Sequence, residues 1–257
     1  MEYRQMLNKV PEVTIFFWII KILATTVGET AADFLNFNLN WGLTNTTYLM
    51  SALLLITLFF QFKARKYVPG IYWLAVVLIS VVGTLITDNL VDNFGVALET
   101  TTIVFTIALL ATFAAWYASE KTLSIHSIYT TRREAFYWLI ILFTFALGTA
   151  AGDLTAEGLN LGYLNSALMF AALIGVVTIA HYFFKLNGVL AFWIAYILTR
   201  PLGASLGDYL SQPRDAGGLG LGTVGTSAIF LVIILVLVIY LTKTRRDQLP
   251  SPNVAEE

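Results

Sequence analysis

The stretch "WIIKILATTVGETAAD", residues 18–33, combines a tryptophan, a glycine and an aspartate at a spacing that recurs along the chain. Nine residues separate the tryptophan from the glycine, and four separate the glycine from the aspartate. The same spacing begins again at Trp73, Trp138 and Trp193. The motif glycines are Gly28, Gly83, Gly148 and Gly203, and the motif aspartates are Asp33, Asp88, Asp153 and Asp208. Four ungapped copies indicate an internal repeat.

The composition is typical of a membrane protein. Of the 257 residues, 58% are hydrophobic and only 12% are charged, whereas about a quarter of the residues in soluble domains are charged. Eight apolar segments are long enough to cross a hydrocarbon core about 30 Å thick. They cover residues 13–35, 45–62, 70–92, 98–118, 135–157, 163–184, 189–211 and 225–242. We therefore expect an all-α integral membrane protein with eight transmembrane helices, in which short connections make consecutive helices antiparallel neighbours.

The motif lies on the odd-numbered segments, so the repeated unit is a helical hairpin. Three even-numbered segments open with related stretches, "GLTNTT", "GYLNSA" and "GTVGTS". Because each unit contains two spans, the four repeats run in parallel, and their pseudo-symmetry axis should lie along the membrane normal. We place the repeats at about residues 12–66, 67–120, 132–186 and 187–243 of a single transmembrane domain spanning 1–243, followed by a solvated cytoplasmic tail, 244–257. Since the first segment carries the motif, we do not expect it to be a cleaved signal peptide.

Basic residues outside the spans predict the orientation, because cytoplasmic loops are enriched in Lys and Arg. Twelve of these thirteen residues fall on the side of the two chain termini, and only Arg214 falls on the other side. Both termini should therefore be cytoplasmic. The motif tryptophans would then form an aromatic belt at the inner interface, and the motif aspartates would lie in the outer half of the membrane.

Six acidic residues fall within the predicted spans, against two basic residues. The acids are Glu29, Asp33, Asp88, Glu99, Asp153 and Asp208, and the bases are Lys21 and Arg200. Ionised groups at this depth are costly unless they are paired, hydrated or neutralised. Lys21 and Arg200 can compensate two acids as charge partners. The remaining acids should converge on the symmetry axis and be protonated, be hydrated or hold a cation. Asp92 and Glu157, further out, should lie at the water interface.

Glu29 breaks the symmetry of the repeat. The equivalent positions hold Thr84, Thr149 and Ala204, whereas Asp33 has an aspartate at every equivalent position. Repeated features usually serve the architecture, so we expect Glu29 to carry a coupling proton. Glu29 and Asp33, one helical turn apart on the same face, form a tentative metal or cation site.

Structural explanations compete with these functional ones. The motif glycines can permit close helix packing or, alternatively, act as hinges. The motif aspartates can hold the bundle together through interhelical hydrogen bonds, and Glu29, Lys21 and Arg200 can form a purely structural network. His126 and His181 fall in no ligand-like cluster, and we expect them at loops or helix ends.

The fourfold motif, with "VGETAAD", "GTAAGD" and "TRPLGASLGD", resembles a family of bacterial integral membrane proteins with a fourfold repeated hairpin of unknown function. The resemblance covers residues of about 12–243 and implies a multi-pass protein of the bacterial inner membrane. It is associated with metal or alkali-cation resistance only faintly, so it implies little about mechanism.

The combined features favour a secondary transporter, in which protons drive export of a hard metal or alkali cation through the acidic pathway. Oxygen ligands without thiols suit hard cations, and the chain has no cysteine. The alternative is a channel, or a non-transporting membrane scaffold with structural carboxylates. Lys21 and Arg200 also leave room for an anionic or organic substrate, since they could bind a carboxylate. We expect no enzyme, because no nucleophile–base pair, metal triad or phosphate loop is visible. We also expect no cofactor, and a net charge of −1 gives no reason for a nucleic-acid partner.

Overall fold

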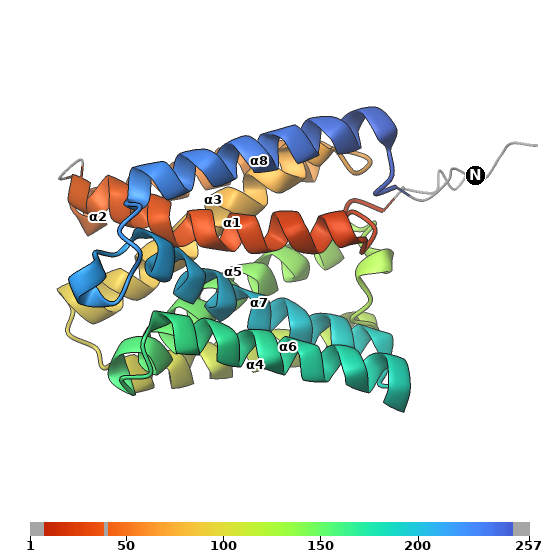
Figure 1. Ribbon diagram of the computed structural model, residues 1–257. Coiled ribbons are helices and arrows are strands. Elements are labelled where there is room, and N and C mark those ends of the chain that lie inside the picture. The colour runs from red at the N-terminus through yellow and green to blue at the C-terminus, as the bar shows by residue number, and fades with distance from the viewer. Residues whose placement is uncertain (1–7, 39–40, 249–257) are drawn as a thin grey trace, which may run out of the picture.

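The described part of the chain is helical throughout its long segments. The computed structural model describes residues 8–38 and 41–248, and these residues form eight long α-helices (Figure 1). The helices are α1 (Ile15–Asp33), α2 (Leu43–Lys63), α3 (Pro69–Asp88), α4 (Leu98–Glu120), α5 (Thr131–Asp153), α6 (Tyr163–Phe184), α7 (Gly188–Ser211) and α8 (Thr223–Thr244). All eight are long and apolar enough to cross a membrane. The predicted eight-helix, four-repeat fold is confirmed.

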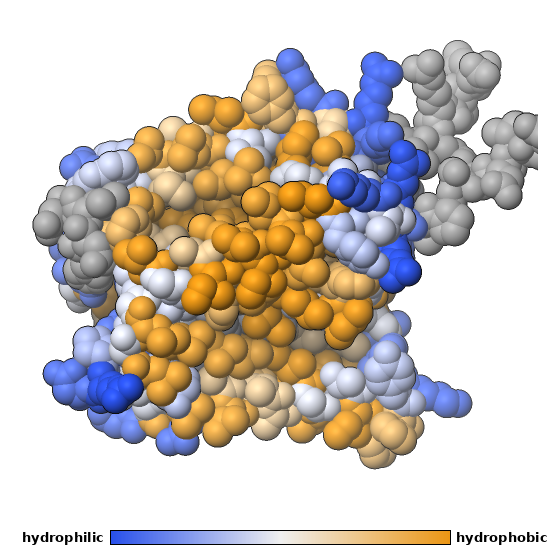
Figure 2. Space-filling view, turned by 45° about the horizontal axis from the view of Figure 1, so that its top comes forward, coloured by the Kyte–Doolittle hydropathy of each residue, from blue (hydrophilic) through white to orange (hydrophobic). Residues whose placement is uncertain are grey.

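The helices form two layers around a common axis. The odd helices form an inner ring in which α1 packs against α3, α3 against α5, α5 against α7, and α7 against α1. The even helices lie outside this ring. Between 61% and 72% of the most apolar stretch of each odd helix is buried, against 11–22% for the even helices. The outer surface is correspondingly apolar, with a broad hydrophobic band between two polar ends (Figure 2).

Each outer helix packs mainly against the inner helix of the next repeat and not against the inner helix of its own repeat. Helix α2 packs mainly on α3, α4 on α5, and α6 on α7, and α8 closes the circle by packing on α1; Figure 1 shows α8 running beside α1. The expected packing of consecutive helices therefore holds between repeats, whereas the two helices of one repeat make few contacts with each other. Each even helix fits the groove beside the next odd helix instead of its own hairpin partner.

Glycines begin three of the even helices. Gly42, Gly162 and Gly222 immediately precede α2, α6 and α8 with φ angles of 74°, 76° and 73°. This left-handed region is open to glycine at little cost, whereas a Cβ would be strained there. The related openings of the even segments thus encode the sharp entry into each outer helix.

The bundle has two different ends, which we call the terminal end and the acidic end. The terminal end holds Ile15 and Thr244, the first residue of α1 and the last of α8, and the acidic end holds the motif aspartates. Aromatic side chains fill the ring at the terminal end. Trp73, Trp138 and Trp193 are all less than 5% exposed, so the predicted aromatic belt at the lipid interface is wrong for these three. These tryptophans lie on the helix faces that point into the ring, so neighbouring helices cover them.

Polar contacts close the terminal end. The Lys9 ammonium donates to Glu134 Oε2 at 2.7 Å and to the carbonyl of Phe62 at 3.0 Å, and both charged side chains are at most 2% exposed. Gln61 donates to the other carboxylate oxygen of Glu134 at 3.0 Å. The segment before α1 is thereby tied to α2 and α5, and its only buried cation is neutralised within the described residues.

The segment after α8 also makes polar contacts at the terminal end. Tyr67 donates to Asp247 Oδ2 at 2.7 Å, and the backbone N–H of Glu12 donates to the Asp247 carbonyl at 2.9 Å. Burial and the Asp247 carboxylate raise the pKa of Tyr67, so its hydroxyl remains a donor. Asp247 is 1% exposed, which corrects the expectation of a solvated tail at this residue, whereas Arg245 and Arg246 are exposed as expected. The rest of the predicted tail, 249–257, lies outside the described residues.

Candidate ion site in the helix ring

The motif glycines allow the ring to close. A Cβ added to Gly28 would collide with Ser80, and one at Gly83 would lie 2.7 Å from Phe145. The equivalent neighbours are Arg200 for Gly148 and Thr25 for Gly203. In every case the neighbour stands three residues before the motif glycine of the adjacent inner helix. The four contacts are therefore related by the pseudo-symmetry, and the inner helices continue through the glycines without a break.

Arg200 crosses this ring and joins the other three inner helices. Its Nη2 donates to Glu29 Oε2 at 2.9 Å, to Thr149 Oγ1 at 2.6 Å and to Thr84 Oγ1. Gly148 leaves room for the stem of this side chain, which is fully buried. The three acceptors occupy the position that follows the motif glycine in each repeat. One arginine thus binds the polar members of an entire symmetry-related layer.

Three carboxyl groups meet on the acidic side of Arg200. Oxygens of Glu29, Asp153 and Asp208 all lie within 4.8 Å of one another. Two oxygens on opposite sides of a cation, each about 2.4 Å from it, would be about 4.8 Å apart, so this separation fits an ion such as Ca²⁺. Glu29 and Asp208 are buried and Asp153 is half-buried. We call these three residues the acid cluster.

Asp33 and Asp88 stand beside the acid cluster. Both are half-buried, and both are close enough to Glu29 for electrostatic repulsion. The ring therefore brings together five of the six acids predicted within the spans. No described residue donates a hydrogen bond to the side chain of any motif aspartate. The described residues thus supply no donor for the interhelical hydrogen bonds that the structural explanation requires.

Three of the motif aspartates are the last residues before a π-helical turn. The turns are η1 (Phe34–Asn38), η2 (Asn89–Asn93) and η4 (Leu154–Gly158), which follow α1, α3 and α5 directly. Asp208, in contrast, stays within α7. A π-turn widens the helix and is often found at functional sites. The ring therefore loosens just beyond the aspartates on three sides.

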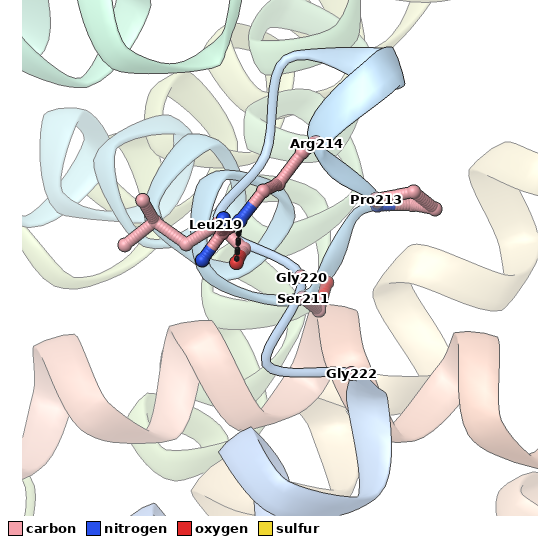
Figure 3. Close-up of a pocket in the computed structure, with 6 residues that line it drawn as sticks. All are labelled: Ser211, Pro213, Arg214, Leu219, Gly220 and Gly222. Carbon is pink, nitrogen blue, oxygen red and sulfur yellow. Dashed lines mark hydrogen bonds between the residues drawn. The ribbon is translucent and has the colours of Figure 1, made fainter.

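The connection after α7 replaces the fourth π-turn with a folded loop. It closes over a pocket of 510 Å³ that includes Pro213, Arg214 and Gly220 (Figure 3). Arg214 donates from Nε to the carbonyl of Leu219 at 3.5 Å, and Figure 3 shows its side chain turned back onto this loop. Among the described residues, Arg214 is the basic side chain at the acidic end, and it pairs with its own loop instead of the acid cluster.

Two predicted site residues lie apart from the acids. Glu99 is exposed in the first turn of α4, because the outer helices do not reach the axis. Lys21 is buried inside the ring, but its ammonium contacts no carboxylate among the described residues. It stands eight residues before Glu29, a rise of about 12 Å along the helix, which is too far for an ion pair.

The remaining polar residues lie where the sequence places them. Asp92 and Glu157 are exposed beyond the aspartates. His126 lies 3.2 Å from Glu12, and Nδ1 of His181 lies 2.8 Å from the Leu186 carbonyl oxygen. Both histidines border a groove of about 780 Å³ between α1, α6 and α7 at the terminal end. Neither takes part in the acid cluster.

Sequence reasoning missed two sets of partners. Thr84 and Thr149 were visible only as the uncharged equivalents of Glu29, yet both accept from Arg200; their shared repeat position was the available signal. The Lys9–Glu134 pair joins residues 125 positions apart, and no local pattern marks it.

The fourfold architecture agrees with a comparison against protein families. The model of the family described as "Repeat of Unknown Function (DUF347)" matches residues 16–67, 71–122, 136–187 and 191–247. The chain belongs to this family. Its members share the repeated unit seen here as one inner and one outer helix, which confirms the predicted resemblance. No curated protein and no solved structure matches the chain. The DUF347 chain is thus a multi-pass membrane protein whose inner helix ring holds several ionisable groups.

Proposed function

We propose that this protein is a secondary transporter that exchanges a hard cation for protons, with the acid cluster as the shared site. The observation that carries the proposal is the convergence of Glu29, Asp153 and Asp208 within 4.8 Å. Carboxylates held so close repel one another strongly unless a cation or protons lie among them. Oxygen-only coordination favours Mg²⁺, Ca²⁺, Mn²⁺ or alkali ions over soft metals.

Local charge balance favours a divalent cation. With Arg200 paired to Glu29 at 2.9 Å, the three ionised carboxyl groups and one guanidinium carry a net charge of −2. One divalent cation or two protons neutralise it, so exchange between them leaves the acid cluster and Arg200 together uncharged. Any other number of bound cations or protons would leave a net charge, which is costly in surroundings of low dielectric constant. This balance couples the entry of the cation to the loss of protons.

The two ends of the ring support a one-sided access in this conformation. Asp33, Asp88 and Asp153 are half-buried at the acidic end, whereas Arg200 and Lys21 are 0% exposed further along the axis. An ion could exchange at the acidic end while the aromatic side chains and the Lys9–Glu134 contact block the terminal end. Transport would require the terminal end to open.

A membrane scaffold is the second candidate. It is favoured by Arg200, which binds residues of three other helices and so holds the ring together. The motif aspartates do not support this role, since no hydrogen bond from another described residue reaches their side chains. We do not propose an enzyme, because a nucleophile beside a base is not seen at the described site.

Purified protein in proteoliposomes provides the test. Mn²⁺, Mg²⁺, Ca²⁺, Na⁺ or K⁺ would be added outside vesicles that hold a proton gradient and a pH dye. One of these cations should collapse the gradient only in vesicles that contain the protein. A deletion strain grown with the same cation in excess should accumulate more of it, measured as total cell metal. If no cation moves protons and no metal content changes, the proposal of cation–proton exchange is wrong.

We also propose that the terminal end faces the cytoplasm of a bacterial inner membrane. The asymmetry of the Lys and Arg residues supports this orientation. Arg4 belongs to this set and lies outside the described residues. Reporter fusions after Leu43, Ala97 and Asp215 should report the outside, and one after Lys66 the inside. A cytoplasmic signal after Asp215 would contradict the orientation.

A further inference from the structure

The middle of the ring contains two buried basic side chains but only one buried acid bound to them. Lys21 and Arg200 are both 0% exposed. Arg200 makes its three hydrogen bonds from Nη2 alone. Its Nε and Nη1, and the Nζ of Lys21, have no hydrogen-bond partner among the described residues. Buried polar groups are nearly always satisfied, and those that are not commonly indicate an unseen water or ion.

The two cations share an aromatic neighbour. Lys21 Nζ lies 4.4 Å from the ring centroid of Phe145, and the guanidinium carbon of Arg200 lies 5.7 Å from the same centroid. Lys21 also lies over the ring of Tyr196 at 4.0 Å. The two positive charges are close enough to repel each other. Aromatic faces compensate a cation only partly, so Phe145 and Tyr196 do not replace a counter-ion.

A further unpartnered donor lies in the same layer. Ser80, like Arg200, stands three residues before a motif glycine, and its hydroxyl is buried without a partner. Its position on α3 faces the ring at Gly28. Inner helices α1, α3 and α7 therefore each carry a buried donor that no acceptor among the described residues satisfies.

We propose that a small monovalent anion of the chloride class binds between Lys21 and Arg200, with the Ser80 hydroxyl as an additional donor. Glu29 neutralises one of the two cations, so a single negative charge completes the balance. The site is closed to solvent, and a large or multivalent oxyanion would lose more hydration than these few donors restore. This site is distinct from the acid cluster, and its existence does not depend on cation transport.

Thermal unfolding in nanodiscs tests the proposal. Chloride should raise the unfolding temperature of the wild-type protein by about 3 °C or more over gluconate at equal ionic strength. Lys21→Met should lose this shift, and in gluconate it should unfold at a higher temperature than wild type, because an uncompensated buried charge has been removed. Lys185→Met, at an exposed lysine after α6, is the matched control and should keep the full shift.

A measurement on the wild-type chain covers the case in which Lys21→Met does not fold. Crystals grown with bromide in place of chloride should show an anomalous peak between Lys21 Nζ and the Arg200 guanidinium. The proposal is overturned if that position shows water or nothing, or if wild type and Lys21→Met respond equally to chloride. Either result would mean that the amine is held neutral or hydrated, and it would leave the proteoliposome assay of cation exchange unaffected.

Discussion

The two ends of the inner ring differ in how their buried charges are compensated. At the terminal end, Lys9 and Glu134 are buried, 2.7 Å apart and satisfied further by Gln61 and the Phe62 carbonyl. At the acidic end, three carboxyl groups lie within 4.8 Å of one another, and one arginine compensates Glu29 alone. The buried charges of Lys9 and Glu134 balance each other, whereas the charges of the acidic end balance only when a cation or protons are added.

This difference assigns stability to the buried pair at the terminal end and function to the acid cluster at the acidic end. A satisfied buried pair costs much when broken but needs nothing from outside. An unsatisfied cluster stores repulsion that a ligand relieves, so it serves as a binding site. The variants below test this division, from the largest expected effect to the smallest.

Glu29→Gln should abolish cation-driven proton movement in proteoliposomes. The substitution removes the acid that joins the cluster to Arg200, so the guanidinium charge would face the remaining carboxyl groups and weaken cation binding. The protein should still be recovered folded, as judged by size-exclusion chromatography. Asp92→Asn, at an exposed acid of the same end, is the control and should transport as wild type does. Normal transport by Glu29→Gln, with Asp88→Asn or Asp153→Asn inactive, would assign the function to the repeated acids.

Glu134→Gln should destabilise the protein by about 3–5 kcal/mol, because it leaves the Lys9 charge buried and unpaired. The measurement is thermal or denaturant unfolding in detergent. Glu12→Gln removes an acid from the His126 contact, in which the histidine side chain is 53% exposed, and should change stability little. Equal small effects of the two variants would show that the terminal end is not held by this pair.

Asp208→Asn should weaken cation binding by about 10- to 100-fold, a loss comparable with that of other groups that tune ion sites. Asp33→Asn should have a smaller effect, since Asp33 lies beside the acid cluster and not within it. Isothermal titration of the active cation distinguishes them. A larger loss for Asp33 would move the site toward the pair Glu29 and Asp33 that the sequence favours.

Gly83→Leu should cost about 1–3 kcal/mol of stability, because the added side chain overpacks the contact with Phe145 on α5. Gly175→Leu in the outer helix α6 is the control, since a Cβ there meets nothing within 4 Å. Unfolding of both variants in the same detergent gives the comparison. Equal tolerance of leucine at the two positions would remove the packing role of the motif glycine.

The fold was predictable because repetition and hydropathy are both visible in one sequence. The spacing of Trp, Gly and Asp placed four inner helices in register, and the convergence of Asp88, Asp153 and Asp208 followed from it. The separation of Lys21 from every described carboxylate was not predictable, because the depth of a residue on one helix does not reveal which side chain faces it from another. The weak packing between the two helices of one repeat was missed for the same reason, since a repeat in sequence need not be the unit that packs.

The Glu29–Arg200 pair has a consequence for the synthesis and membrane insertion of the protein. Its two residues are 171 positions apart, and translation at about 5–20 residues per second separates their synthesis by roughly 10–30 s. During that interval helix α1 must reside in or near the membrane with Glu29 and Lys21 unmatched. Helix α8, which covers α1, is made later still. The first repeat therefore cannot complete its contacts until the fourth repeat has been synthesised. A ribosome-bound chain should stay with the insertion machinery until nearly the whole protein has been made.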